Sequence, residues 1–162
     1  MPVTSQRLAL AHISLMALVA LAGMFAVPTP SAATPLCTAD ATTLCIDQAA
    51  GDGRWEVKLD WATTLNGGSS GHAHALPLAS VGISRGGLFW IFSADNPELI
   101  VKVIDGCGYN NRYWVFAGGL TNVETHLTVR DTLHPTAVFT RTNPLDQAFA
   151  PILSIEAFDT CP

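Results

Sequence analysis

Two histidines separated by one residue are the strongest metal-like feature of this sequence. In an extended segment His72 and His74 point to the same side, because side chains alternate between the faces of a strand. A metal site would need a third ligand, for which Asp60 and Asp95 are candidates. We favour a solvated loop instead, since the Gly- and Ser-rich segment 66–71 precedes the pair. The prediction is therefore no metal ligand and no cofactor.

Several oxygen-bearing side chains near predicted turns have the chemistry of calcium ligands. They are Asp47, Asp52, Asp95, Asn96, Glu98 and Asp105. Their spacing does not match an EF-hand loop, and Asp-Asn-Pro and Asp-Gly are common turn sequences. We therefore interpret them as turn residues rather than as a calcium site.

Catalytic motifs are lacking along the whole sequence: there is no G-x-S-x-G, no H-E-x-x-H and no P-loop. Ser70, His72 and Asp60 form a trio only on paper, without a strained turn or an oxyanion-binding segment. Lys102 lies within a predicted strand, where we expect a structural role. It either pairs across the sheet with an acid such as Glu98 or Glu124, or lays its aliphatic stem along apolar surface with the ammonium in solvent. The sequence predicts no catalytic residue.

Aromatic residues offer a different kind of site, a platform for sugar rings or peptides. Trp90, Tyr109, Tyr113 and Trp114 are the candidates, although aromatic side chains in strands more often belong to the core. Among them, Trp90, Tyr109 and Tyr113 are the predicted ligand-facing residues.

The elements that position these residues are short strands. Residues 55–61 alternate apolar and charged side chains over seven positions, which is typical of a strand with one buried face. Similar runs, separated by Gly-, Asn- and Pro-containing turns, recur at residues 75–81, 88–92, 98–104, 112–117, 125–130, 137–142 and 155–158. Seven or eight short strands without a convincing helix predict an antiparallel β-sandwich, immunoglobulin- or fibronectin-like in general architecture.

The first 33 residues have the pattern of a secretory signal peptide. Arg7 precedes an apolar run over residues 8–27, and Ser31 and Ala33 stand three residues and one residue before the expected cleavage site. An uncleaved transmembrane anchor is the alternative, because the apolar run is about long enough to span a bilayer. We expect one domain over residues 34–162, secreted to the periplasm, cell surface or medium and free of the membrane after cleavage.

Four cysteines remain in that domain, and an even number in an exported chain indicates two disulfides. We favour Cys37–Cys45 and Cys107–Cys161, grouped by their positions in the sequence. Loss of Arg7 leaves seven Lys and Arg against 13 Asp and Glu, a net charge of −6. Without a basic cluster, the chain is a poor partner for nucleic acid.

Several short segments spread over nearly the whole domain follow a shared pattern: Leu44-Cys45-Ile46, Phe89-Trp90-Ile91-Phe92, Asn96-x-Glu98-Leu99, Val101-Lys102-Val103, Asp105-Gly106, Trp114-Val115-Phe116, Leu120-Thr121 and 127–132. In these segments the chain resembles an exported bacterial domain of unknown function. The family pattern has a Gly-containing turn after this last segment, whereas this chain has 133–136 without glycine. The resemblance implies export and β structure, and it implies no catalytic residues.

Together these features favour a secreted or cell-surface binding or structural module without catalytic activity. Its expected partner is an envelope or extracellular protein or polysaccharide. Two alternatives remain open: a small secreted inhibitor of an extracellular enzyme, and a small exported hydrolase.

Overall fold

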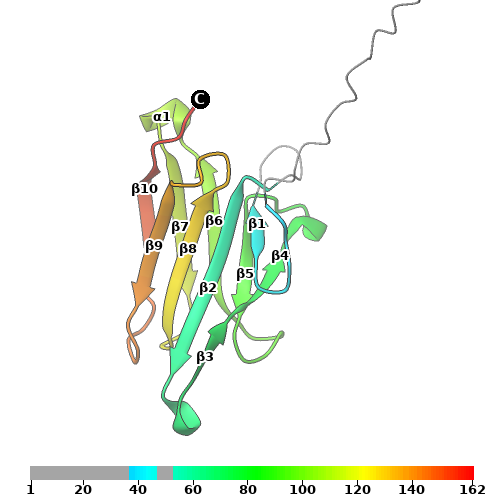
Figure 1. Cartoon of the computed structure of the whole chain (residues 1–162), viewed down its shortest axis with the longest axis vertical. Helices are drawn as coiled ribbons and strands as arrows, with labels where there is room; N and C mark the ends of the chain where they lie inside the picture. Colours follow the sequence, from blue (N-terminus) through cyan, green and yellow to red (C-terminus); the bar gives the residue numbers. More distant parts are fainter. Residues whose placement is uncertain (1–36, 47–52) are drawn as a thin grey trace, which may run out of the picture. The chain divides into compact units, whose positions relative to one another are not determined.

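The computed structural model describes residues 37–46 and 53–162, which form ten strands in two antiparallel sheets packed face to face (Figure 1). Sheet A contains β1 (Leu44–Ile46), β2 (Trp55–Thr63), β3 (Ser69–His72), β8 (Glu124–Asp131) and β9 (Val138–Asn143). Sheet B contains β4 (His74–Pro77), β5 (Gly86–Trp90), β6 (Pro97–Asp105), β7 (Tyr113–Gly119) and β10 (Ile152–Phe158). The predicted antiparallel β-sandwich is confirmed.

The predicted number of strands, seven or eight, is wrong because the sequence pattern did not predict two short strands. These are β1, of three residues, and β3, which lies in the Gly- and Ser-rich segment expected to be a loop. Both pair with β2, one along each half of that long strand. Backbone pairing with β2 therefore sets their conformation, although their own side chains give little β preference.

The alternating pattern of β2 fixes its position in the core as expected. Trp55, Val57 and Leu59 are buried, and Trp61 packs on the core with its ring against the edge of Phe92 at 5.5 Å between centroids. The core also takes inward-facing residues from the other strands of both sheets. Burial of such side chains is the main favourable contribution to folding.

The chain crosses from sheet A to sheet B between β3 and β4. Ala73 is fully buried at this crossing, and its N–H donates to the Leu59 carbonyl at 2.8 Å. His72 therefore belongs to sheet A and His74 to sheet B. The prediction that the two histidines point the same way in one extended segment is wrong, because the crossing separates them.

Both predicted disulfides are present, Cys37–Cys45 and Cys107–Cys161. The second ties α1 (Cys107–Asn110), a single turn between β6 and β7, to the C-terminal residues after β10. The other helical elements in the described part of the chain are two 3-10 turns, η1 (Leu65–Gly67) and η2 (Ala79–Val81). η2 replaces the second half of the strand predicted over residues 75–81.

Two features of the chain's periphery complete the fold. At one side of the sandwich β9 and β10 lie next to each other, and each ends its own sheet (Figure 1). Among the described residues, no helix is long and apolar enough to cross a membrane. The signal peptide predicted over residues 1–33 lies outside the described residues and stays a prediction.

Candidate functional site

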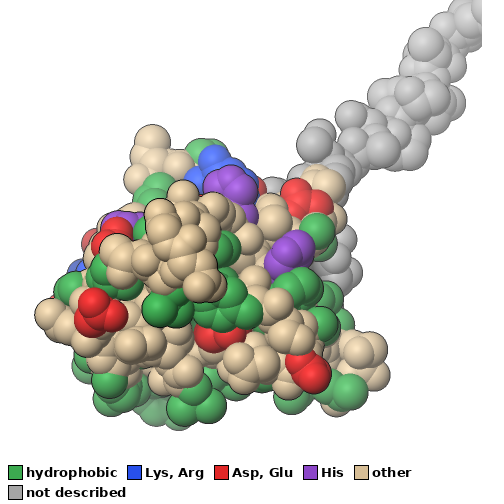
Figure 2. All heavy atoms as spheres, turned by 90° about the horizontal axis from the view of Figure 1, so that it is seen from below, with side chains coloured by type: hydrophobic (Ala, Val, Ile, Leu, Met, Phe, Trp, Pro, Cys, Tyr) green, Lys and Arg blue, Asp and Glu red, His purple; other side chains and the backbone are tan. Residues whose placement is uncertain are grey.

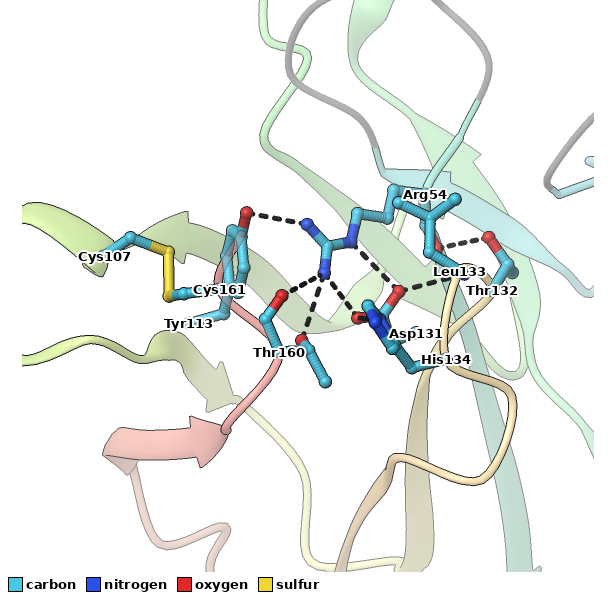
Figure 3. A network of polar contacts seen from close by, with 9 residues as sticks. All are labelled: Arg54, Cys107, Tyr113, Asp131, Thr132, Leu133, His134, Thr160 and Cys161. Carbon is cyan, nitrogen blue, oxygen red and sulfur yellow. Dashed lines mark hydrogen bonds and ion pairs between the residues drawn. A yellow bond between two sulfur atoms is a disulfide. The ribbon is translucent and has the colours of Figure 1, made fainter.

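A buried ion pair at one end of the sandwich is the centre of a network of polar contacts (Figure 3). Arg54, just before β2, binds Asp131 at the end of β8 through two hydrogen bonds, Nε to Oδ1 at 3.0 Å and Nη2 to Oδ2 at 2.6 Å. Its Nη1 donates to the Tyr113 hydroxyl at 2.6 Å, and Nη2 also donates to the Thr160 carbonyl at 2.9 Å. One guanidinium therefore joins both sheets to the C-terminal segment.

The electrostatics of this pair suit a structural role. Burial alone would raise the pKa of the Asp131 carboxyl, but the hydrogen bonds and charge of Arg54 outweigh it and lower the pKa to about 2. Burial also opposes the charge of Arg54, yet Asp131 holds the pKa of the guanidinium above its usual value. A carboxylate so stabilised in its ionised form is a poor proton donor or acceptor near neutral pH.

The predicted turn after β8 depends on the same carboxylate. Asp131 accepts a hydrogen bond from the backbone N–H of Leu133 at 3.0 Å and contacts His134 Nδ1 at 3.1 Å. This turn, which has no glycine over residues 133–136, is therefore closed by a side chain. Sequence reasoning missed Arg54 and Asp131, because nothing in the sequence links residues 77 positions apart.

The four residues considered as a metal set do not come together. His72 and Asp60 are in contact, with Nδ1 and Oδ1 2.5 Å apart, but His74 stacks on Trp90 with ring centroids separated by 3.9 Å. Asp95 hydrogen-bonds Ser93 in the β5–β6 turn. Of the predicted set, only one histidine and one carboxylate share a place.

The oxygen-bearing turn residues act largely as turn chemistry predicts. Asp105 accepts a hydrogen bond from Cys107 N at 2.8 Å. Glu98 differs, because it is buried and accepts from Ile91 N at 2.7 Å and from Asn96 Nδ2 at 3.1 Å. Burial raises the pKa of its carboxyl above the usual value. Asp47 and Asp52 lie outside the described residues.

Of the two structural roles expected of Lys102, the pair with Glu98 or Glu124 is wrong. Its ammonium lies 5.4 Å from the centroid of the Phe116 ring on the next strand. Glu98, near the start of β6, is buried and accepts from Ile91 N, and Glu124 contacts His126 Nε2 at 2.9 Å. Lys102 thus covers an aromatic side chain, in keeping with the structural role expected of it.

The predicted ligand-facing aromatics separate into two groups. Tyr113 is buried against Trp55 and Arg54, so its prediction as a ligand-facing residue is wrong. Tyr113 is the first residue of β7, and buried and half-buried side chains alternate from that position, so Tyr113 points into the core. Trp90 lies half-buried on the other face of sheet B, and Tyr109 is 86 % exposed beside Trp114.

That outer face of sheet B carries a row of apolar side chains across neighbouring strands. Leu76, Leu88 and Ile100 lie opposite one another in β4, β5 and β6. In the next row, Phe116 of β7 lies opposite Leu153 of β10. With Ile104 and Trp114, which are also paired, these residues form what we call the apolar face: Leu76, Leu88, Ile100, Ile104, Trp114, Phe116 and Leu153.

Much of the apolar face is open to solvent. The exposed fraction is 50 % for Ile100 and 74 % for Leu153, and Lys102 is the one charged residue in the rows that define the face. Sequence reasoning missed this surface, because outward Ile100 and Ile104 beside inward Val101 and Val103 resemble a strand buried on both faces. Across the end of the molecule seen in Figure 2, Lys and Arg likewise occupy only small areas.

A groove lies between the edge strands β9 and β10. This groove has a volume of about 590 Å³ and is lined by Arg141, Asn143, Phe149, Ile152 and Glu156, among others. The Asn143 amide donates to the backbone carbonyls of Val123 and Gln147, which holds the loop after β9 in place. The groove is open rather than enclosed, and Arg141 and Glu156 are its charged lining residues.

Comparison of the chain with family models, curated proteins and solved structures finds no match. The resemblance to an exported bacterial domain of unknown function therefore stays a prediction.

Proposed function

We propose that this domain is a non-catalytic binding module of the cell surface or extracellular space, and that the apolar face of sheet B is its contact surface. The observation that carries the proposal is the row of solvent-exposed aliphatic side chains across the strands of that sheet. Large contiguous apolar patches are uncommon on the surface of monomeric proteins and mark interaction sites.

The composition of the face favours a protein partner over a polysaccharide. Its exposed members, such as Leu76, Ile100 and Leu153, are aliphatic and offer no hydrogen bonds to sugar hydroxyls. The two exposed-face aromatics singled out by sequence, Trp90 and Tyr109, lie toward opposite ends of sheet B rather than on one platform. Trp90 pairs with the first residue of β6 and Tyr109 contacts Trp114, whose partner is Ile104.

Two features support a site of action outside the cytoplasm. The disulfides Cys37–Cys45 and Cys107–Cys161 fit an oxidising compartment. The N-terminal apolar run with small residues before residue 34 fits export.

The test is retention of envelope and secreted proteins on the immobilised domain, compared among three forms. Ile100→Asp places a charge in the centre of the apolar face. Val138→Asp is the matched control, since Val138 is 48 % exposed and points outward from β9 of sheet A. We expect the partner to bind the unmodified protein and the Val138 variant, and to bind the Ile100 variant at least about tenfold more weakly, a loss of about 1.4 kcal/mol.

Thermal unfolding of each variant is the check that both remain folded. Equal retention by the Ile100 variant and the unmodified protein would remove the apolar face as the contact surface. Retention of polysaccharide without protein would contradict the partner class, and a partner that is an enzyme whose activity falls on binding would favour the inhibitor alternative.

A further inference from the structure

We propose that the outer face of sheet A binds a divalent metal ion, with His72 and His126 as nitrogen ligands and Asp60 and Glu124 as oxygen ligands. The register of three neighbouring strands places these residues together. His72 of β3 lies opposite Asp60 of β2, and Asp60 lies opposite His126 of β8. A carboxylate is thereby flanked by a histidine on each side.

All four side chains project from the same, solvent-facing side of the sheet. Leu59 beside Asp60 and Leu127 beside His126 are buried in the core, so their neighbours point outward. Glu124 precedes His126 by two residues on β8 and therefore shares its face. The side chains of His72, Asp60, His126 and Glu124 are 72, 50, 48 and 36 % exposed, so each is free to turn toward an ion.

The backbone spacing suits one ion above Asp60. The hydrogen bond from Ala73 N to the Leu59 carbonyl makes His72 and Asp60 a non-hydrogen-bonded pair, the closer kind, with Cα atoms about 4.5 Å apart. The Cα atoms of Asp60 and His126 are about 5.5 Å apart as a hydrogen-bonded pair. Two imidazoles that bracket a carboxylate at this spacing can place nitrogens on a common ion at about 2.0–2.1 Å.

In the present side-chain conformations the ligands are paired with one another. Asp60 Oδ1 lies 2.5 Å from His72 Nδ1, Glu124 Oε1 lies 2.9 Å from His126 Nε2, and Thr142 Oγ1 lies 3.0 Å from His126 Nδ1. Within residues 37–46 and 53–162, no three such groups yet converge on one point. Metal binding would exchange these contacts for metal–ligand bonds through rotation of exposed side chains.

Charge and ligand type define the ion. Two carboxylates and two neutral imidazoles carry a net charge of −2, and the nearest cation along β2, Lys58, contacts Glu56 Oε1 at 3.5 Å instead. Two nitrogen and two oxygen ligands suit Zn²⁺ in tetrahedral geometry. His74, the partner of His72 in the sequence motif, stacks on Trp90 of sheet B and takes no part.

The experiment is a calorimetric titration of Zn²⁺ into the purified protein, produced without a histidine tag. We expect one ion per chain. His72→Ala and His126→Ala should each bind Zn²⁺ at least about tenfold more weakly than the unmodified protein, since each removes one ligand. His74→Ala is the matched control, and we expect it to bind like the unmodified protein. Because the substituted side chains are exposed, the melting temperature without zinc should stay near that of the unmodified protein.

Three results would overturn the proposal: no Zn²⁺ binding by the unmodified protein, undiminished binding by His126→Ala, or an equal loss in His74→Ala. As a second readout, the imidazole resonances of His72 and His126 should shift together in NMR spectra on addition of Zn²⁺. A shift of His72 alone would contradict a site shared across the strands.

Discussion

At the scale of single residues, Arg54 combines an ion pair with an aromatic contact. Its guanidinium lies over the Tyr113 ring at 4.3 Å from the centroid while it binds Asp131 and Thr160. Asp131 is fully buried, so removal of its partner leaves a carboxylate without a compensating charge. The sequence shows neither residue as special, because a partnership across 77 positions has no local pattern.

Replacement of this arginine should cost far more than replacement of a surface one. We expect Arg54→Met to lower the free energy of unfolding by about 3–5 kcal/mol, the usual cost of a broken buried pair. Arg130→Met removes a pair with Glu56 in which the arginine is 41 % exposed, and should cost under about 1 kcal/mol. Urea unfolding compares the two, and equal losses would show that Asp131 does not depend on Arg54.

The lowered pKa of Asp131 also predicts acid sensitivity. Its carboxyl has a pKa of about 2 in the folded protein, below the value of about 3.9 in an unfolded chain. A lowered folded pKa contributes stability above about pH 4, and this stability is lost as the pH falls toward 2. The contribution at neutral pH is on the order of 2 kcal/mol.

The measurement is urea unfolding between pH 5 and pH 2 for the unmodified protein and Asp131→Asn. The unmodified protein should lose more stability over this range, because the asparagine cannot take up a proton. Parallel pH profiles would assign the acid sensitivity to other carboxyls.

At the scale of elements, the alternation of apolar and polar residues predicted the long strands, but not the strands that pair with them or the faces that stay exposed. β2 and β8 follow their patterns because each has one buried face, and Leu59 lies opposite Leu127 in the core. β3 was missed because Ser69, Ser70 and Gly71 carry no apolar signal, and only pairing with β2 makes the segment extended. β6 was predicted as a strand, but its outward-facing isoleucines are as apolar as its inward-facing valines, so the sequence did not show which face is exposed.

Close packing around α1 leads to a prediction at this scale. A Cβ atom at Gly106, the residue before α1, would come within 2.2 Å of Trp114 Nε1 and 2.8 Å of the Arg112 carbonyl oxygen. Gly106→Ala should therefore cost about 1–3 kcal/mol through overpacking. Gly108→Ala, within α1, meets nothing within 4 Å and should be near neutral. Thermal unfolding measures both, and equal melting temperatures would mean that Trp114 moves aside freely.

At the scale of the whole molecule, two disulfides and a small core share the stabilisation. The Cys107–Cys161 bridge closes a loop of 54 residues and the Cys37–Cys45 bridge a loop of eight. Both pairings followed from the grouping of cysteines in the sequence. The apolar face did not follow from the sequence, because the exposure of a side chain depends on which other elements pack against it in the folded protein.

Loss of the longer loop closure should destabilise the protein more. The chain-entropy relation assigns about 4 kcal/mol to Cys107–Cys161 and about 2.6 kcal/mol to Cys37–Cys45. We expect the Cys107→Ser and Cys161→Ser double variant to unfold at lower urea concentration than the Cys37→Ser and Cys45→Ser variant. The reverse order would indicate that the short bridge carries local packing beyond loop closure.

The crossing at Ala73 has a consequence for self-association. Because the chain changes sheets there, one segment is divided into two edge strands of only four residues each, β3 in sheet A and β4 in sheet B, and Ala75 N also donates to the Ala41 carbonyl at 2.8 Å. On the opposite flank β9 and β10 end the two sheets with strands of six and seven residues. Short edge strands blunt pairing with another chain, so the β9–β10 flank is the more open of the two to edge-to-edge association. Two copies that pair through strand edges should therefore do so through β9 or β10.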